Sequence, residues 1–284
     1  MILDVYHWTE YRYSEPVLLS RHQLHMRPRE LAHQRVLSTR FEFIPDPAVV
    51  SEHEDYFGNK ITTFLVEEAH IGTHIKCLSR VEVSPREIPP DEETVRWEKV
   101  RELAGEEAAE FVYPSPYAPW IEELREWAKP SFPKGRTVLA GAKDLMRRIQ
   151  AEFVFDKTAT SVSTPLSEVF RDKRGVCQDF THLQIACLRS HGIPARYMSG
   201  YFRTLPLPGQ PKRFGADASH AWGAFFAPGH GWIELDPTNN RMVNDEYVTI
   251  GWGRDYGDVS LIRGSLSGGG DHSLFLSVNV ESVG

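Results

Sequence analysis

The first ninety residues constrain the fold most strongly, because they consist of short strand-like runs separated by turn-forming residues. Aromatic residues alternate with polar ones in VYHWTEYRY, and four further runs are strand-like: VLLSRHQLHMRP, RVLSTRFEFIP, KITTFLVEEA and HIKCLSRVEV. Pro, Gly, Asn and Asp interrupt the runs. Several short strands at this spacing are typical of an antiparallel sandwich. We therefore expect an N-terminal β-sandwich domain over residues 1–90.

The pattern changes after Pro89, where IPPDEET marks a boundary. Residues 91–135 contain an acidic helical stretch and a proline-rich run, and we interpret them as a connecting region. Val138 to Phe153 has apolar residues at helical spacing, which predicts the first helix of a second domain over residues 136–265. Residues 266–284 begin with the glycine-rich run SLSGGG, which predicts a flexible connector. The alternating strand Ser273 to Val280 is expected to join the N-terminal domain, and the expected fold class is α+β.

Composition excludes several classes of function. The net charge of −7 argues against a nucleic-acid or membrane-surface binder, because both need a basic face. No apolar run approaches the ~20 residues that span a bilayer, and the N-terminus lacks the layout of a secretory signal. There are only three cysteines, and an odd, small number does not form a disulfide framework. We therefore expect a reducing compartment, the cytoplasm.

A helix with a cysteine at its start is predicted within Gly175 to Tyr197. Its buried stripe contains Phe180, Leu183, Ala186 and Cys187, and Gly192 is placed to end it. Cys177 then lies in the first turn, where unpaired N–H groups and the helix dipole favour a thiolate and could receive an oxyanion. We expect Gly175 to leave room for a substrate beside the sulfur. Cys187 has apolar neighbours and is expected in the core.

Two strands downstream offer partners for this thiol. A strand from Ser219 places His220 and Trp222 on one face, and a second strand ends at Asp236. If the two strands are adjacent and antiparallel, a carboxylate lies beside the imidazole, which it can orient and stabilise as a cation. The pattern indicates nucleophilic thiol catalysis. Gln178 and Trp222 are candidates for the oxyanion hole or substrate cleft, and the upstream side chains Trp120, Trp127 and Gln150 cannot be aligned to that role.

Other interpretations remain open. Cys177 could be a small buried residue near a helix start. Cys177, His220 and Asp236 could bind zinc, although no metal site is predicted. Asp179 and His182 are expected to have a capping or core role. A non-catalytic scaffold that binds peptides through the cleft is a further alternative.

Three motifs resemble those of the transglutaminase-like superfamily, whose core is similar to papain-type cysteine proteases: RGVCQDF, SHAW and GWIELDPTNN. Further segments resemble the bacterial group with an extra N-terminal β domain, among them YHWTEYRYSEPV, DYFGN, GIPARYMSGY and GWGRDYGDVS. The resemblance extends over nearly the whole chain.

The resemblance implies roles for three residues. Cys177 is the expected nucleophile, His220 the general base and Asp236 the orienting acid of an acyl-enzyme reaction at an amide or peptide carbonyl. The expected enzyme is a transglutaminase-like acyltransferase, or alternatively a cysteine protease or amidase of the same fold. Protein or peptide substrates are expected, with no cofactor. No EF-hand-like acidic loop occurs, so we expect independence from calcium.

Overall fold

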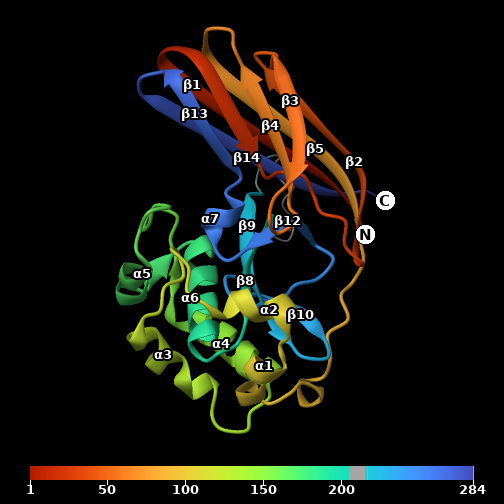
Figure 1. Cartoon of the computed structure of the whole chain (residues 1–284), viewed down its shortest axis with the longest axis vertical. Coiled ribbons are helices and arrows are strands. Elements are labelled where there is room, and N and C mark those ends of the chain that lie inside the picture. The colour runs from red at the N-terminus through yellow and green to blue at the C-terminus, as the bar shows by residue number, and fades with distance from the viewer. Residues whose placement is uncertain (205–214, 216, 284) are drawn as a thin grey trace, which may run out of the picture.

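The computed structural model describes residues 1–204, 215 and 217–283. Its upper part in Figure 1 is an antiparallel sheet that curls around its longest strand, β1. Within the described residues this sheet has seven strands: β1 (Ile2–Leu24), β2 (Gln34–Ile44), β3 (Val49–Glu54), β4 (Lys60–Val66), β5 (His70–Val83), β13 (Ile262–Gly268) and β14 (His272–Val283).

Strand β1 belongs to two layers of this sheet. Its first half pairs with β5 and β14, and its second half pairs with β4 and β13. The pairing with β5 changes register between Arg12 and Val17, where β1 passes from one layer to the other. Leu24, Phe64 and Ile75 come from both layers and meet in one buried cluster. The predicted α+β class with an N-terminal β domain is confirmed, and the two layers of the expected sandwich are parts of one curled sheet.

The lower part of the molecule is a mixed domain built on a second antiparallel sheet. The strand order in the described residues is β11 (Arg241–Met242), β10 (Gly231–Asp236), β9 (Ser219–Ala227), β8 (Ala195–Phe202) and β12 (Tyr247–Gly253). Two short strands, β6 (Val154–Phe155) and β7 (Arg174–Gly175), pair in parallel as a separate two-stranded sheet. The helices are η1 (Asp91–Glu93), α1 (Trp97–Leu103), α2 (Glu106–Ala109), η2 (Glu110–Val112), α3 (Glu122–Ala128), η3 (Lys129–Ser131), α4 (Val138–Glu152), α5 (Leu166–Asp172), α6 (Cys177–Ser190) and α7 (Tyr256–Val259).

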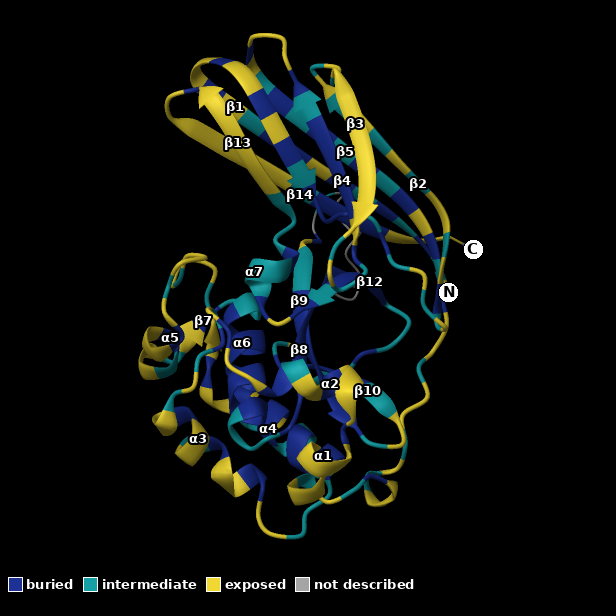
Figure 2. Ribbon diagram, in the orientation of Figure 1, coloured by how far each residue is buried: buried dark blue, intermediate teal, exposed yellow. Residues whose placement is uncertain are grey.

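Helix α6 is the centre of this lower domain. It packs against β8 and β9, and every residue from Asp179 to Arg189 is buried, as the dark ribbon in Figure 2 shows. Gly192 follows the helix with a φ of 75°, a left-handed conformation that glycine adopts without strain. The predicted helix, with its start at Cys177 and its end before Gly192, is therefore confirmed. So is the helix that was predicted from Val138, which is α4.

The C-terminal segment differs in part from the expectation. Ile262 to Gly268 is a strand along β1, not the end of the second domain followed by a flexible connector. Gly268, Gly269 and Gly270 all have positive φ, and they form the tight connection between β13 and β14. The connector expectation is wrong because consecutive glycines serve a sharp turn here. Strand β14 then pairs with β1 along Ile2 to Tyr13.

Two amide side chains fasten the domains together. Strand β12 lies at an edge of its sheet, so its outer backbone groups need partners. Gln34 Nε2 donates to Thr249 O at 2.8 Å, and Thr249 N donates to Gln34 Oε1 at 2.8 Å. Asn59 exchanges the same pair of hydrogen bonds with Trp252, at 2.8 and 3.0 Å. Each amide thus continues the sheet with one peptide-like group, and the contact fixes the β domain next to the lower sheet.

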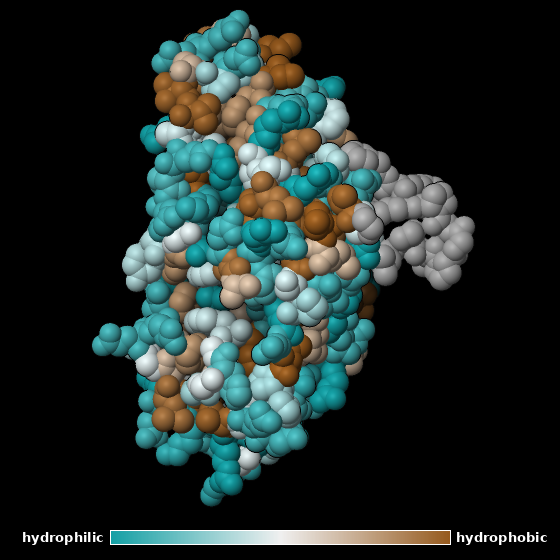
Figure 3. Space-filling model, turned by 90° about the vertical axis from the view of Figure 1, so that its right-hand side faces the viewer, coloured by the Kyte–Doolittle hydropathy of each residue, from teal (hydrophilic) through white to brown (hydrophobic). Residues whose placement is uncertain are grey.

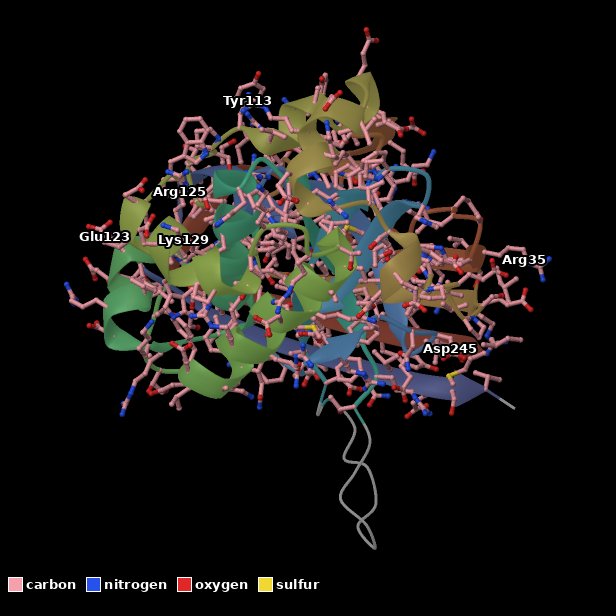
Figure 4. The ribbon with its side chains drawn as sticks, turned by 90° about the horizontal axis from the view of Figure 1, so that it is seen from below. Arg35, Tyr113, Glu123, Arg125, Lys129 and Asp245 are labelled. Carbon is pink, nitrogen blue, oxygen red and sulfur yellow. The ribbon has the colours of Figure 1, made fainter. Side chains whose placement is uncertain are left out.

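The outer surface is polar around this framework. On the face shown in Figure 3, hydrophilic residues dominate and apolar groups appear as separate patches. Seen from below in Figure 4, Glu123, Arg125 and Lys129 project outward from the rim of the lower domain. No helix among the described residues is long and apolar enough to cross a membrane.

Candidate active site

Cys177 is the first residue of α6, so its side chain lies beside the free backbone N–H groups of the first helical turn. The N–H of Val176 donates to Asp179 Oδ2 at 2.8 Å. Thr160 Oγ1 donates to the same oxygen at 2.7 Å, which ties the loop before α5 to the start of the helix. Cys177 is partly exposed, whereas Asp179 is buried. The fold thus presents the thiol at a helix N-terminus, a position that favours an anion.

Gly175 has a different role from the expected one. A Cβ at this position would lie 2.6 Å from Asp179 Oδ2, and Gly175 is itself buried. The space beside the glycine is therefore occupied by the capping carboxylate and does not receive a substrate. The expectation that Gly175 leaves room beside the sulfur is wrong, because the start of α6 itself packs there.

His220 and Asp236 lie side by side on neighbouring strands. His220 is near the start of β9, Asp236 ends β10, and the two strands pair antiparallel. His220 Nε2 lies 2.6 Å from Asp236 Oδ2. A carboxylate can only accept, so the imidazole N–H donates in this contact. The strands therefore bring together the two residues that the sequence pattern placed together.

Asp236 is fully buried and accepts five hydrogen bonds from described residues. Besides His220, Tyr247 OH and Asn239 Nδ2 each donate to Oδ2 at 2.7 Å. The backbone N–H groups of Thr238 and Asn239 donate to Oδ1 at 2.9 and 3.2 Å. Five donors keep the side chain ionised in spite of its burial. Its orientation toward His220 is fixed by the same bonds.

The pKa of His220 reflects these neighbours. Burial lowers this pKa, but the charge of Asp236 and hydrogen bonds to Asp236 and Cys177 outweigh burial and raise it to about 10. For Asp236, burial raises the pKa, and His220, Asn239 and Tyr247 together lower it below its ordinary value. His220 is thus a cation near neutral pH, held between a buried carboxylate and the sulfur of Cys177.

Trp222 does not fit the cleft role that was expected for it. The indole is fully buried and packs against Met198 and Tyr247. Its only donor, Nε1, is bonded to Glu234 Oε2 at 2.6 Å. Trp222 and Ala224 of β9 belong to a buried apolar cluster. Sharing a face of the strand with His220 therefore does not place a side chain in the cleft.

Gln178 lies one residue after Cys177 and is partly exposed. It has no hydrogen-bond partner in the part of the chain that the structure describes. The upstream candidates lie elsewhere. Trp120 is exposed in a hollow with Arg101 and Gly192, at the far end of α6. Trp127 Nε1 donates to Glu152, and Gln150 is exposed on α4.

Tyr247 and Asn239 belong to the site although sequence reasoning missed their contacts. Asn239 stands in the quoted motif GWIELDPTNN, and an amide three residues after a buried acid is a local signal that could have been used. Tyr247 gave no such signal, because it reaches Asp236 from the edge strand β12, which is separated from β10 by β9 and β8 in the sheet.

Asp179 and His182 have the structural roles that were expected. Asp179 caps α6. His182 is buried, stacks on Tyr117 at a centroid distance of 5.6 Å, and accepts from the N–H of Tyr256 at 3.2 Å. Among the described residues, no three His, Cys, Asp or Glu side chains are grouped as metal ligands would be.

Comparisons with known proteins place this arrangement in a family. The family described as "Bacterial transglutaminase-like N-terminal region" matches residues 3–82, and "Transglutaminase-like superfamily" matches residues 125–237. An uncharacterized protein of Mycobacterium tuberculosis is 38% identical over 290 residues, which cover 98% of this chain and 91% of the relative. An uncharacterized protein of Mycobacterium leprae is 31% identical over 292 residues, which cover 99% of this chain and 99% of the relative.

A solved structure shares the whole architecture. The crystal structure of a proposed cysteine protease from Cytophaga hutchinsonii superposes with a TM-score of 0.80 at 21% identity, covering 100% of this chain and 91% of that one. At this identity the likeness shows the fold. Together with the two matched regions and the full-length relatives, it leads to one conclusion: this chain belongs to the transglutaminase-like superfamily, with the N-terminal region found in its bacterial members.

Proposed function

We propose that this protein is a cysteine enzyme that transfers or hydrolyses an acyl group at an amide or peptide carbonyl, with Cys177, His220 and Asp236 as its reacting and orienting residues. The observation that carries the proposal is the ion pair of His220 with a fully buried Asp236, on an imidazole whose pKa the nearby Cys177 helps to raise. A histidine held in this way can keep a thiol ionised and return the proton later.

The reaction follows from these positions. The Cys177 thiolate attacks the carbonyl carbon, and the free N–H groups at the start of α6 stabilise the oxyanion that forms. His220 gives its proton to the departing amine as the C–N bond breaks, which leaves a thioester on Cys177. Water or a second amine then attacks the thioester and loses a proton to His220, which releases the thiolate. Asp236 keeps the imidazole oriented and stabilises its cation. Gln178 follows Cys177 and is partly exposed, and we assign it to contact with the substrate.

The molecule that accepts the acyl group decides the type of enzyme. Transfer to an amine makes the protein a transglutaminase, and transfer to water makes it a peptidase or amidase. The structural neighbour from Cytophaga hutchinsonii, described as a proposed cysteine protease, supports including peptides among the substrates.

The three cysteines are free in the structure, which suits the reducing cytoplasm.

A mass-spectrometric assay tests the proposal and separates the two types. Glutamine-containing peptides are incubated with the protein, with and without an added primary amine. Incorporation of the amine identifies a transglutaminase, whereas ammonia release or backbone cleavage without incorporation identifies a hydrolase. The Cys177→Ala protein is the matched control and should give neither product. If wild type and Cys177→Ala proteins both leave a diverse peptide library unchanged and bind its members equally, the non-catalytic scaffold replaces this proposal.

A further inference from the structure

The outer face of the β domain carries a polar hollow that the proposed chemistry does not use. Its volume is about 350 Å³. Five side chains line it: Arg21, Gln23, Thr63, Arg263 and Ser265. His22 and Gly264, which stand between them in the sequence, also border the hollow.

The register of three strands explains why these side chains meet. On β1, Gln23 pairs with Thr63 of β4 on one side and with Arg263 of β13 on the other. Arg21, two residues earlier on β1, pairs with Ser265 of β13. Residues two apart on a strand point to the same face. The five side chains therefore form two adjacent rows on one face, while Leu24, Phe64 and Ile262 pack on the opposite face.

None of these five side chains has a hydrogen-bond or ion-pair partner within the described residues. Thr63 is the clearest case, because it is only 7% exposed and its Oγ1 is buried without a partner. Folded proteins satisfy nearly all buried hydroxyl groups, and Thr63 lines the hollow, so its hydroxyl is a donor that a group bound there could use after a small rotation of the side chain.

The two arginines differ from the other arginines on the strands of this domain. Arg12, Arg35, Arg40 and Arg80 each form an ion pair with an Asp or Glu of the same sheet. Arg21 and Arg263 form no ion pair among the described residues, although the chain carries a net charge of −7. Arg263 is near enough to help lower the pKa of Asp258, but that carboxylate is bonded to Arg254. No carboxylate lines the hollow. Two guanidinium groups, one amide and two hydroxyls can all donate, and the group that complements such a set is an oxyanion.

We propose that this hollow binds an oxyanion, a carboxylate or a phosphate, between Arg21 and Arg263 and above the Thr63 hydroxyl. The same chemistry can come from an acidic side chain of a polypeptide or from a small free anion. The hollow lies on the β domain, and the binding of an anion there does not depend on a reaction at Cys177.

Calorimetric titration of the full-length Cys177→Ala protein tests the site without turnover. One arm uses inorganic phosphate at constant ionic strength, balanced with chloride. The other arm uses a Glu-rich peptide and the same peptide with Gln in place of Glu. Each arm compares three proteins: the parent, Arg21→Gln with Arg263→Gln, and the control Arg35→Gln with Arg80→Gln, which removes the same charge from paired arginines on the same sheet.

We expect saturable binding of phosphate or of the Glu peptide, weaker by at least about tenfold in the Arg21/Arg263 variant and unchanged in the control, because charge-assisted hydrogen bonds are lost only there. Binding of the Glu peptide alone identifies a polypeptide as the source, and binding of phosphate alone identifies a small anion. Thr63→Val provides a second test that leaves the charge unchanged: it should weaken binding and raise the melting temperature of the free protein. Absence of saturable binding in both arms, or equal loss in both double variants, would overturn the proposal, whatever the assay of Cys177 chemistry shows.

Discussion

The two ends of α6 place the same side chain in opposite surroundings. Cys177 begins the helix, is partly exposed and lies near His220, whose pKa it helps to raise. Cys187 lies ten residues later, about 15 Å along the axis, is fully buried, and donates its S–H to Leu124 O at 3.7 Å. Burial raises the pKa of Cys187 to about 12.

The helix dipole accounts for part of this difference. Its positive end favours a negative charge at Cys177, and its negative end is matched by the buried Arg189, whose guanidinium bonds Ala195 O, Arg254 O and Ser115 Oγ. The position of a cysteine on this helix thus decides whether it packs in the core or can react. Each variant below changes a residue at one of the two ends and tests this difference.

His220→Ala should have the largest effect. It removes the cation next to Cys177, which is also the group that we propose moves the proton, so turnover should fall by about 10²–10⁴-fold or more. Steady-state kinetics with a substrate found in the peptide assay measure the loss. Retention of more than about a tenth of the wild-type rate would show that another group serves as the base.

Asp236→Asn should cost less turnover than His220→Ala, because nucleophile and base both remain. It should also change how stability depends on pH. The pKa of His220 is about 10 in the folded protein, against an ordinary value of 6.5. The folded state therefore binds the extra proton, and this stabilisation is complete below pH 6.5 and disappears as the pH rises toward 10.

Urea unfolding between pH 6 and pH 10 measures that profile. The destabilisation by Asp236→Asn, relative to wild type, should be largest at the acidic end and should shrink as His220 loses its proton in both proteins. A destabilisation that grows with pH instead would contradict the raised pKa of His220.

Tyr247→Phe should have a smaller effect, because Asp236 keeps four of its five donors. We expect kcat to fall by about tenfold with little change in KM, which corresponds to the loss of one hydrogen bond to a charged group, ~1.5 kcal/mol. The pH profile of kcat should shift, since the carboxylate beside His220 is altered. Tyr201→Phe is the matched control, because its hydroxyl bonds His7 away from Asp236, and it should leave the profile unchanged.

Cys187→Ala should leave activity unchanged and lower stability by about 1 kcal/mol, from lost packing of a small buried side chain. Urea midpoints of wild type and variant measure the change. Loss of activity under conditions in which the variant is still fully folded would contradict the separation between the two ends of α6.

Some of these features follow from the sequence and others depend on packing between distant segments. The helical spacing of Phe180, Leu183 and Cys187 indicates the helix, and Gly192 marks its end, so both were predictable. The spacing did not show that every residue from Asp179 to Arg189 is buried, which depends on the segments that surround α6. Alternation placed His220 and Asp236 on two successive strands, and the structure shows that these strands pair. Alternation could not show that Trp222 points into a closed cluster, because that depends on what β12 and Glu234 place opposite it. The roles of Gly175 and Tyr247 also required the fold, since each is set by a neighbour's side chain.

The most direct test of the central claim is the rate at which iodoacetamide alkylates each cysteine of the native protein near neutral pH, read by peptide mass spectrometry. We predict rapid modification of Cys177 and none of Cys187 or Cys77, both of which are buried. In His220→Ala, the rate at Cys177 should fall to that of an ordinary exposed thiol. Modification of Cys187 as fast as that of Cys177, or a Cys177 rate that does not depend on His220, would contradict the account.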